Sequence, residues 1–229
     1  MTRISIVIPV LNEGQGIAAA LAALAPLRNC GYEVIVIDGG SSDGTPALAR
    51  GAADRVASAP RGRASQMNAG AALARGEVLL FLHADTRLPE HADARILQGL
   101  EASGRAWGRF DVRIEGASVL LPVIAFFMNL RSRTTGIATG DQAIFVHRDA
   151  FRRVGGFPPL GLMEDIALSR SLKRLSRPLR LADRAVTSGR RWERRGVLRT
   201  VFLMWRLRLA FFFGAAPATL ARLYDGDRG

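Results

Sequence analysis

The chain has 229 residues, a hydrophobic fraction of 48% and a formal net charge of +12. This length and composition predict a globular protein with a sizeable core and exclude a disordered chain. The single cysteine, Cys30, excludes an internal disulfide and a cysteine-based zinc cluster. The excess of basic residues leaves nucleic acid, an anionic membrane surface or a phosphorylated substrate as partners.

The first 85 residues alternate between apolar runs and helical patterns. Strands are predicted at 4–10, 33–38, 55–57 and 78–82, and helices at 17–27, 47–51 and 62–75. A continuous apolar run such as 78–82 is typical of a strand covered on both faces. The repeated alternation predicts an α/β fold with a mostly parallel, doubly wound sheet and helices on both of its faces.

The rest of the chain is less regular. Helices are predicted at 90–100, 149–154 and 164–174, strands at 107–114 and 142–147, and a basic loop at 131–141. The apolar stretch 117–130 is too short, and too interrupted by Pro122, to predict a membrane span.

Segment 194–213 has a basic, amphipathic helical pattern. The residues that can share its apolar face are Leu198, Val201, Phe202, Trp205, Leu209 and Phe212. Two interpretations remain open. The face packs into the core, or it lies on an anionic membrane, because arginine with tryptophan and phenylalanine is typical of interfacial helices.

Polar side chains follow three of the predicted strands. They are Asn12 and Glu13, then Asp38 and the loop to Thr45, then His83 and Asp85. In a parallel sheet these loops share the carboxyl edge, where open α/β sheets bind ligands. Carboxylates there suit a divalent cation shared with phosphate oxygens, and a further acid from residues 164–165 suits a general base. Capping of strand and helix ends is the simpler explanation of each acid taken alone.

Three segments resemble successive signatures of the family-2 glycosyltransferases: residues 8–13 (IPVLNE), 37–45 (IDGGSSDGT) and 76–85 (GEVLLFLHAD). Residues 163–165 (MED) fall where that family has its acidic catalytic pair. The resemblance covers about residues 4–175 and implies the GT-A fold and inversion at the sugar's anomeric carbon. More narrowly, residues 83–86 (HADT) with 190–196 (RRWERRG) resemble a bacterial subgroup labelled arsenosugar-biosynthesis or radical-SAM-associated glycosyltransferases.

The resemblance implies a nucleotide-sugar site built from both ends of the chain. The residues that match it are Pro9, Asn12, Glu13, Asp38, Arg63, Asn68, His83, Asp85, Arg190, Arg191 and Trp192. Asp38 matches the acid that hydrogen-bonds the base, commonly uracil, and Arg63 suits a phosphate. A solvated helix face is the alternative for Arg63 and Asn68, and a basic surface run is the alternative for residues 190–192.

The resemblance also implies a metal site and a catalytic pair. Asp85 matches the last acid of the metal-binding D-x-D motif, whose first acid is replaced by His83. We therefore expect Mn²⁺ or Mg²⁺ on Asp85 and His83, although a neutral imidazole adds no negative charge for the metal. Asp165 matches the catalytic base and Glu164 its companion, but spacing does not decide which of the two is the base. An acceptor that is already anionic, such as a lipid phosphate, needs no base, and Asp141 is a second candidate on the acceptor side.

The sequence thus predicts an inverting glycosyltransferase that moves a sugar from a UDP- or GDP-linked donor to a hydroxyl or phosphate of a small-molecule or lipid-linked acceptor. A sugar-phosphate nucleotidyltransferase is an alternative, but it needs a basic glycine-rich loop where residues 11–16 have no basic residue. A nucleic-acid binder is suggested by charge alone, and no nucleic acid is expected because aromatic and basic residues are not interleaved.

We expect a glycosyltransferase domain over 1–189, with a nucleotide-binding half at 1–88 and an acceptor half at 89–189, followed by a basic helical extension over 190–229. No charged leader with an apolar block opens the sequence. The expected location is therefore the cytoplasm, with peripheral contact on the inner face of the cell membrane through residues 194–213.

Overall fold

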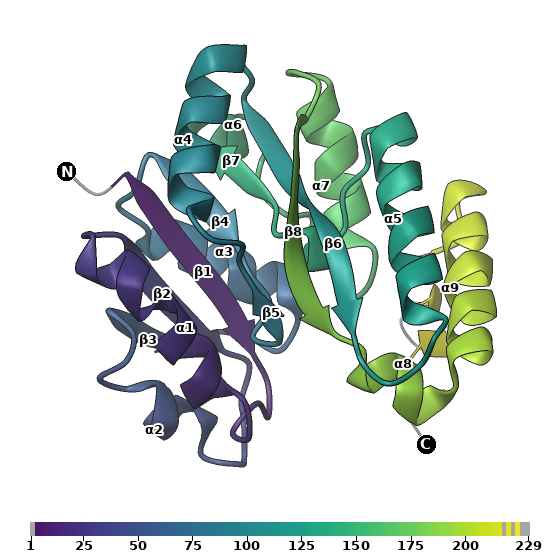
Figure 1. The fold of residues 1–229 in the computed structure, drawn as a ribbon, viewed down its shortest axis with the longest axis horizontal. Helices are drawn as coiled ribbons and strands as arrows, with labels where there is room; N and C mark the ends of the chain where they lie inside the picture. Colours follow the sequence, from purple (N-terminus) through teal and green to yellow (C-terminus); the bar gives the residue numbers. More distant parts are fainter. Residues whose placement is uncertain (1–2, 217–218, 221–222, 225–229) are drawn as a thin grey trace.

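The computed structural model describes residues 3–216, 219–220 and 223–224, except for the side chains of Arg191 and Arg195. These residues form one eight-stranded sheet with helices on both faces (Figure 1). The strands are β1 (Ile4–Val10), β2 (Glu33–Asp38), β3 (Arg55–Ser58), β4 (Val78–Phe81), β5 (Thr86–Arg87), β6 (Trp107–Glu115), β7 (Phe145–His147) and β8 (Leu179–Ser188). Their order across the sheet is β3-β2-β1-β4-β7-β6-β8-β5.

Two apolar clusters bury the two faces of the sheet. The helices are α1 (Ile17–Asn29), α2 (Thr45–Ala49), α3 (Arg63–Leu73), α4 (Ala92–Ser103), α5 (Leu121–Thr135), α6 (Arg148–Arg153), α7 (Glu164–Lys173), α8 (Arg190–Arg195) and α9 (Val197–Phe212), with a 3-10 turn at Gly140–Gln142. Helices α1, α2 and α4 cover one face, and α3, α6 and α7 cover the other. The prediction of helices on both faces is confirmed.

The parallel half of the sheet aligns the loops that the sequence singles out. β1 lies between β2 and β4 and is parallel to both, with Val10 opposite Asp38 and Val7 opposite Phe81. The carboxyl ends of β1, β2 and β4 therefore share one edge of the sheet. Since neighbouring strands lie about 5 Å apart, β2 and β4 are about 10 Å apart across the sheet, and β4 ends three residues earlier in the register than β2.

The second half of the sheet differs from the predicted pattern. β7 runs antiparallel to both β4 and β6, β8 is parallel to β6, and β5 is antiparallel to β8. Strands β5 and β8 are absent from the sequence prediction. The predicted loop 131–141 is wrong at its start, because α5 continues to Thr135, and the predicted strand 142–147 is shorter, because Gln142 belongs to the 3-10 turn.

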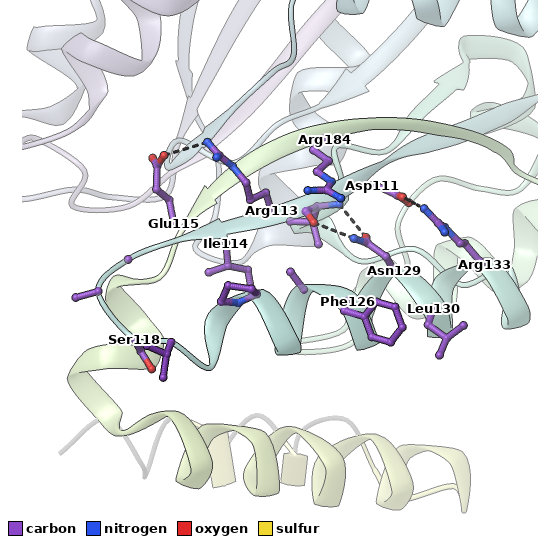
Figure 2. A pocket seen from close by; sticks show the side chains of 16 residues that line it. Asp111, Arg113, Ile114, Glu115, Ser118, Phe126, Asn129, Leu130, Arg133 and Arg184 are labelled. Carbon is purple, nitrogen blue, oxygen red and sulfur yellow. Dashed lines mark hydrogen bonds and ion pairs between the residues drawn. The ribbon is translucent and has the colours of Figure 1, made fainter.

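Helices α5 and α9 lie side by side at the end of the molecule away from β3 (Figures 1 and 2). The segment predicted as one amphipathic helix is broken at Gly196, where φ is +79°. One side of α9 packs against the start of α7, with Leu207 buried beside Met163 and Ile166. The opposite side leaves Leu198, Phe202, Trp205, Leu209 and Phe212 at least 60% exposed. We call these five residues the apolar stripe of α9; packing into the core is therefore the wrong interpretation for them.

Candidate functional site

Two loops at the carboxyl edge are joined by hydrogen bonds from both sides. The backbone N–H of Asn12 donates to Ser41 Oγ at 2.8 Å, and the N–H of Ser42 donates to Asn12 Oδ1 at 2.9 Å. Glu13 donates its N–H to Thr45 Oγ1 at 2.9 Å. The loop after β1 and the loop after β2 therefore form a single surface, in which Ser41 shapes the loop.

Asp38 ends β2 and organises the loop that follows it. Its carboxylate accepts the N–H groups of Gly40 at 2.9 Å and Ser41 at 3.0 Å. The side chain is 4% exposed, so the carboxylate lies below the loop surface. Pro9 is buried in β1 opposite Ile37, on the neighbouring strand. The structure thus places both predicted nucleotide contacts at the same strand ends.

A residue that sequence reasoning left out of the site connects these strand ends. Gln66, buried in α3, donates from Nε2 to the carbonyl oxygens of Val10 and Ile37, each at 2.8 Å. Its carboxamide also packs on Gly39, where a Cβ would come within 3.0 Å of it. Gln66 therefore joins the ends of β1 and β2, where the loops with Asn12 and Ser41 begin. The sequence signal that could have identified Gln66 is a polar residue in a helix made mostly of small residues.

The two predicted residues of α3 have different surroundings. Asn68 uses both ends of its carboxamide on Phe157, donating to the carbonyl at 2.8 Å and accepting the N–H at 2.9 Å. This pairing is a structural role. Arg63, the first residue of α3, is half-buried and faces acids: burial lowers its pKa, but the charges of Glu164, Tyr224, Asp141 and Asp165 outweigh it, so the pKa of Arg63 is raised.

The acidic pair lies beside the end of β4. Asp165 Oδ2 accepts the N–H of Gly140 at 3.0 Å, and Gly140 packs so closely on the ring of His83 that a Cβ there would overlap it. His83 Nδ1 lies 3.3 Å from Asp141 Oδ1. The turn at residues 140–142 therefore links the acids at the start of α7 to the end of β4.

Glu164 is the buried member of the pair, with 5% exposure. Burial and the charge of Asp165 raise its pKa, against the opposing charges of Arg63 and His83. Asp165 is less buried, and it accepts the N–H of Ile166 at 2.7 Å in addition to that of Gly140. The more exposed Asp165 is therefore the better placed of the two to meet a substrate.

Asp85 lies after β4 at the carboxyl edge of the sheet, and its carboxylate can accept further hydrogen bonds or bind a cation. It is half-buried and receives a long 3.4 Å contact from the Thr86 hydroxyl. Within the described residues, no three His, Cys, Asp or Glu side chains gather closely enough to hold a metal ion by themselves. A cation that takes one carboxylate from protein and its other oxygens from phosphate and water still fits Asp85, because Mg²⁺ is commonly held this way.

The basic-aromatic segment of α8 divides between two environments. Arg190 Nη2 lies 3.6 Å from Glu13 Oε2, so α8 reaches the loop after β1. Trp192 packs instead against the apolar cluster of β6 and α5 that includes Ile114 and Leu121. The side chain of Arg191 lies outside the described residues.

Two arginines that the sequence analysis did not nominate face the acidic pair. Arg131 of α5 and Arg208 of α9 both experience the charge of Asp165. For Arg208, an arginine between the apolar residues of α9 was the available signal; Arg131 follows the apolar run of α5 and gave no such signal. By contrast, a cleft of about 770 Å³ between β6 and α5 is lined by none of the nominated residues (Figure 2).

A family profile described as Glycosyl transferase family 2 matches residues 5–155. The chain is 28% identical over 173 residues to an undecaprenyl-phosphate 4-deoxy-4-formamido-L-arabinose transferase from Pseudomonas savastanoi pv. phaseolicola; the match covers 66% of this chain and 47% of the relative. The chain thus spans about half the length of that curated relative.

Solved structures share the fold. The mannosyltransferase PcManGT from Pyrobaculum calidifontis, solved with GDP-Man and Mn²⁺, superposes with a TM-score of 0.65 at 21% identity, covering 98% of this chain and 70% of that one. S. aureus TarS 1–349, solved with UDP-GlcNAc, gives a TM-score of 0.66 at 18% identity, covering 82% and 58%. The expected GT-A fold is confirmed, whereas the arsenosugar subgroup stays a prediction. The profile match covers well over half of the chain, which therefore belongs to glycosyl transferase family 2.

Proposed function

We propose that this protein transfers a sugar from a UDP- or GDP-linked donor to a hydroxyl or phosphate acceptor by a single inverting displacement. The observation that carries the proposal is the arrangement at one sheet edge. Asp38 ends β2, and Asp85 lies in the turn that follows β4, a strand about 10 Å from β2 across the sheet. Asp165 approaches the end of β4 through Gly140 and His83. The relatives solved with GDP-Man and UDP-GlcNAc support a nucleotide-sugar donor.

In this proposal the donor nucleotide lies on the joined loops after β1 and β2. Pro9, Asn12, Glu13 and Asp38 border the base and ribose. Arg63 and Arg190 approach the phosphates from α3 and α8, since arginine suits phosphate geometrically and electrostatically. Asn68 and Trp192 act by holding the surrounding backbone and helices, because their side chains are occupied by Phe157 and by the apolar cluster.

Asp85 would hold a divalent cation, with His83 beside it, and the ion would offset charge on the departing diphosphate. Asp165, oriented by Gly140 and Ile166, would accept the proton of an acceptor hydroxyl, with Glu164 behind it. The mannosyltransferase structure solved with Mn²⁺ supports a divalent cation in general. The division into a domain over 1–189 and an extension over 190–229 is part of the same proposal.

A thermal-shift screen of UDP- and GDP-sugars, with and without Mn²⁺, tests the donor. A ligand that binds the folded state raises Tm with the logarithm of its concentration. We expect a Tm rise with one nucleotide class that Mn²⁺ enlarges, and loss of the Mn²⁺ response in Asp85→Ala. If no nucleotide sugar shifts Tm at millimolar concentration, the proposed function is wrong.

We propose further that the apolar stripe of α9 lies on an anionic bilayer. Exposed Arg194, Arg199 and Arg206 accompany the stripe, and the chain carries +12 overall, which complements anionic lipid. In the described part of the chain, no helix has both the length and the apolarity needed to cross a bilayer, so the proposed contact is interfacial.

Co-sedimentation with vesicles tests this contact. Binding to phosphatidylglycerol vesicles should exceed binding to phosphatidylcholine vesicles, weaken with salt, and fall in Phe202→Ser and Trp205→Ser. Leu48→Ser, which changes a half-exposed leucine on α2, is the matched control. Dimers in solution that dissociate in the two stripe variants, without vesicle binding, would assign the stripe to a second copy and refute the membrane contact.

A further inference from the structure

Arg131 and Arg208 carry polar atoms that the rest of the described chain does not satisfy. Nε and Nη2 of Arg131 and Nε of Arg208 are fully covered, and none has a hydrogen-bond partner within the described residues. Buried polar groups are nearly always paired, and each unpaired one costs free energy. Unpaired donors beside the acidic pair therefore indicate a bound acceptor of hydrogen bonds.

The charges around Arg131 and Arg208 also favour a bound anion. Burial and the nearby charge of Arg208 lower the pKa of Arg131 to about 10, so it stays protonated at neutral pH. Two guanidinium groups thus repel each other in a partly dry site. Asp165 acts on both, but its carboxylate already accepts two backbone N–H groups. Arg109, whose charge also acts on Arg131, adds a third cation, itself paired with Asp111.

Helices α5 and α9 are held in place by contacts that do not involve Arg131 or Arg208. Asn129 of α5 accepts the N–H of Val112 at 2.8 Å and donates to its carbonyl at 2.9 Å, and Arg133 pairs with Asp111 (Figure 2). Leu207, the neighbour of Arg208, is buried against Met163 and Ile166. The helix positions that carry Arg131 and Arg208 are therefore fixed without a ligand.

We propose that Arg131 and Arg208 form the subsite for a phosphate group of the acceptor. This inference rests on the proposed function, because it assigns the acceptor its chemical class. Two arginine side chains match a phosphate dianion in charge and offer several donors to its oxygens. Another arginine, Arg190, reaches the loop after β1, whereas Arg131 and Arg208 experience the charge of Asp165 from α5 and α9.

A phosphate acceptor changes the chemistry expected at the acidic pair. One phosphate oxygen bonds to the anomeric carbon while the bond from that carbon to the donor diphosphate breaks, and the electron pair leaves with the nucleoside diphosphate. The oxygen is already deprotonated, so no proton has to be removed. Asp165 then acts as a positioning residue that holds Gly140 and balances the arginines.

The experiment measures binding of inorganic phosphate, and of dodecyl phosphate in phosphatidylcholine vesicles, to the full chain by calorimetry. Charged hydrogen bonds of this kind are worth about tenfold or more in affinity, so we expect Arg131→Gln and Arg208→Gln each to weaken binding about tenfold. Arg153→Gln, which changes an exposed arginine on α6, is the control and should bind as the wild type does. Arg131→Lys and Arg208→Lys keep the charge, and should recover part of the affinity even if the glutamine variants fold poorly.

Comparable affinity for both probes would identify a soluble phosphate ester, and about tenfold preference for dodecyl phosphate would identify a lipid phosphate; either supports the subsite. Phosphate binding that is unchanged in all four variants overturns it. So does loss of nucleotide binding in these variants, since the arginines would then hold the donor. If no nucleotide binds the wild type but phosphate binding still depends on both arginines, the proposed function fails while the anion site stands.

Discussion

Replacing Gln66 by leucine tests whether its hydrogen bonds to β1 and β2 hold the loops that follow these two strands. The change removes two buried hydrogen bonds of 2.8 Å, to the carbonyls of Val10 and Ile37, and keeps a side chain of similar size. The Val10 oxygen retains the N–H of Gly39 at 3.0 Å, so we count the loss as two ordinary buried hydrogen bonds. At about 1 kcal/mol each, the variant should be about 2 kcal/mol less stable.

Urea unfolding followed by circular dichroism measures this loss, with Ser65→Ala on the same helix as a control expected to lie within about 0.5 kcal/mol of wild type. Calorimetry with the nucleotide found in the thermal-shift screen should show weaker binding by Gln66→Leu at a temperature where the variant is fully folded. Unchanged stability together with unchanged nucleotide affinity would refute the role assigned to Gln66.

Three further changes test the site. Because burial and Asp165 raise the pKa of Glu164, the folded chain holds that proton more tightly than the unfolded chain, and stability falls as pH rises above about 4.3. Glu164→Gln should therefore gain stability over wild type as pH rises from 4 to 8 in urea titrations; a constant difference would contradict this. Gly140→Ala should lower turnover, measured as nucleoside diphosphate release, because the new Cβ overlaps His83; full turnover would rule out that contact as important. Asp38→Ala removes the acceptor for two loop N–H groups and should weaken nucleotide binding about tenfold by calorimetry, whereas wild-type affinity would take Asp38 out of the site.

The parallel half of the fold could be predicted from the sequence because its strands are continuous apolar runs between helical patterns. β8 could not, because its more buried positions carry Asp183 and Thr187 as well as leucine and alanine, so burial alternates along the strand but apolarity does not. Its pairing with β6 also shifts register, since Phe110 lies opposite Leu181 but Asp111 lies opposite Arg184.

The candidate site shows the same limit. Motif spacing could place Asp38 at a strand end, Asp85 in the turn after a strand and Asp165 at a helix start, because those positions depend on local sequence. It could not show that Asn68 is occupied by Phe157, that Trp192 packs on β6 and α5, or that Arg131 faces Asp165. Each of these depends on how distant segments pack, which periodicity does not encode.

The contact between Arg190 and Glu13 joins residues 177 positions apart. A ribosome adds about 5–20 residues per second, so roughly 10 to 35 s separate the synthesis of one partner from that of the other. During that interval the loop after β1 exists without the cation that will face it. The growing polypeptide therefore cannot form this contact until its last quarter has been made, so the proposed donor site is completed late in synthesis.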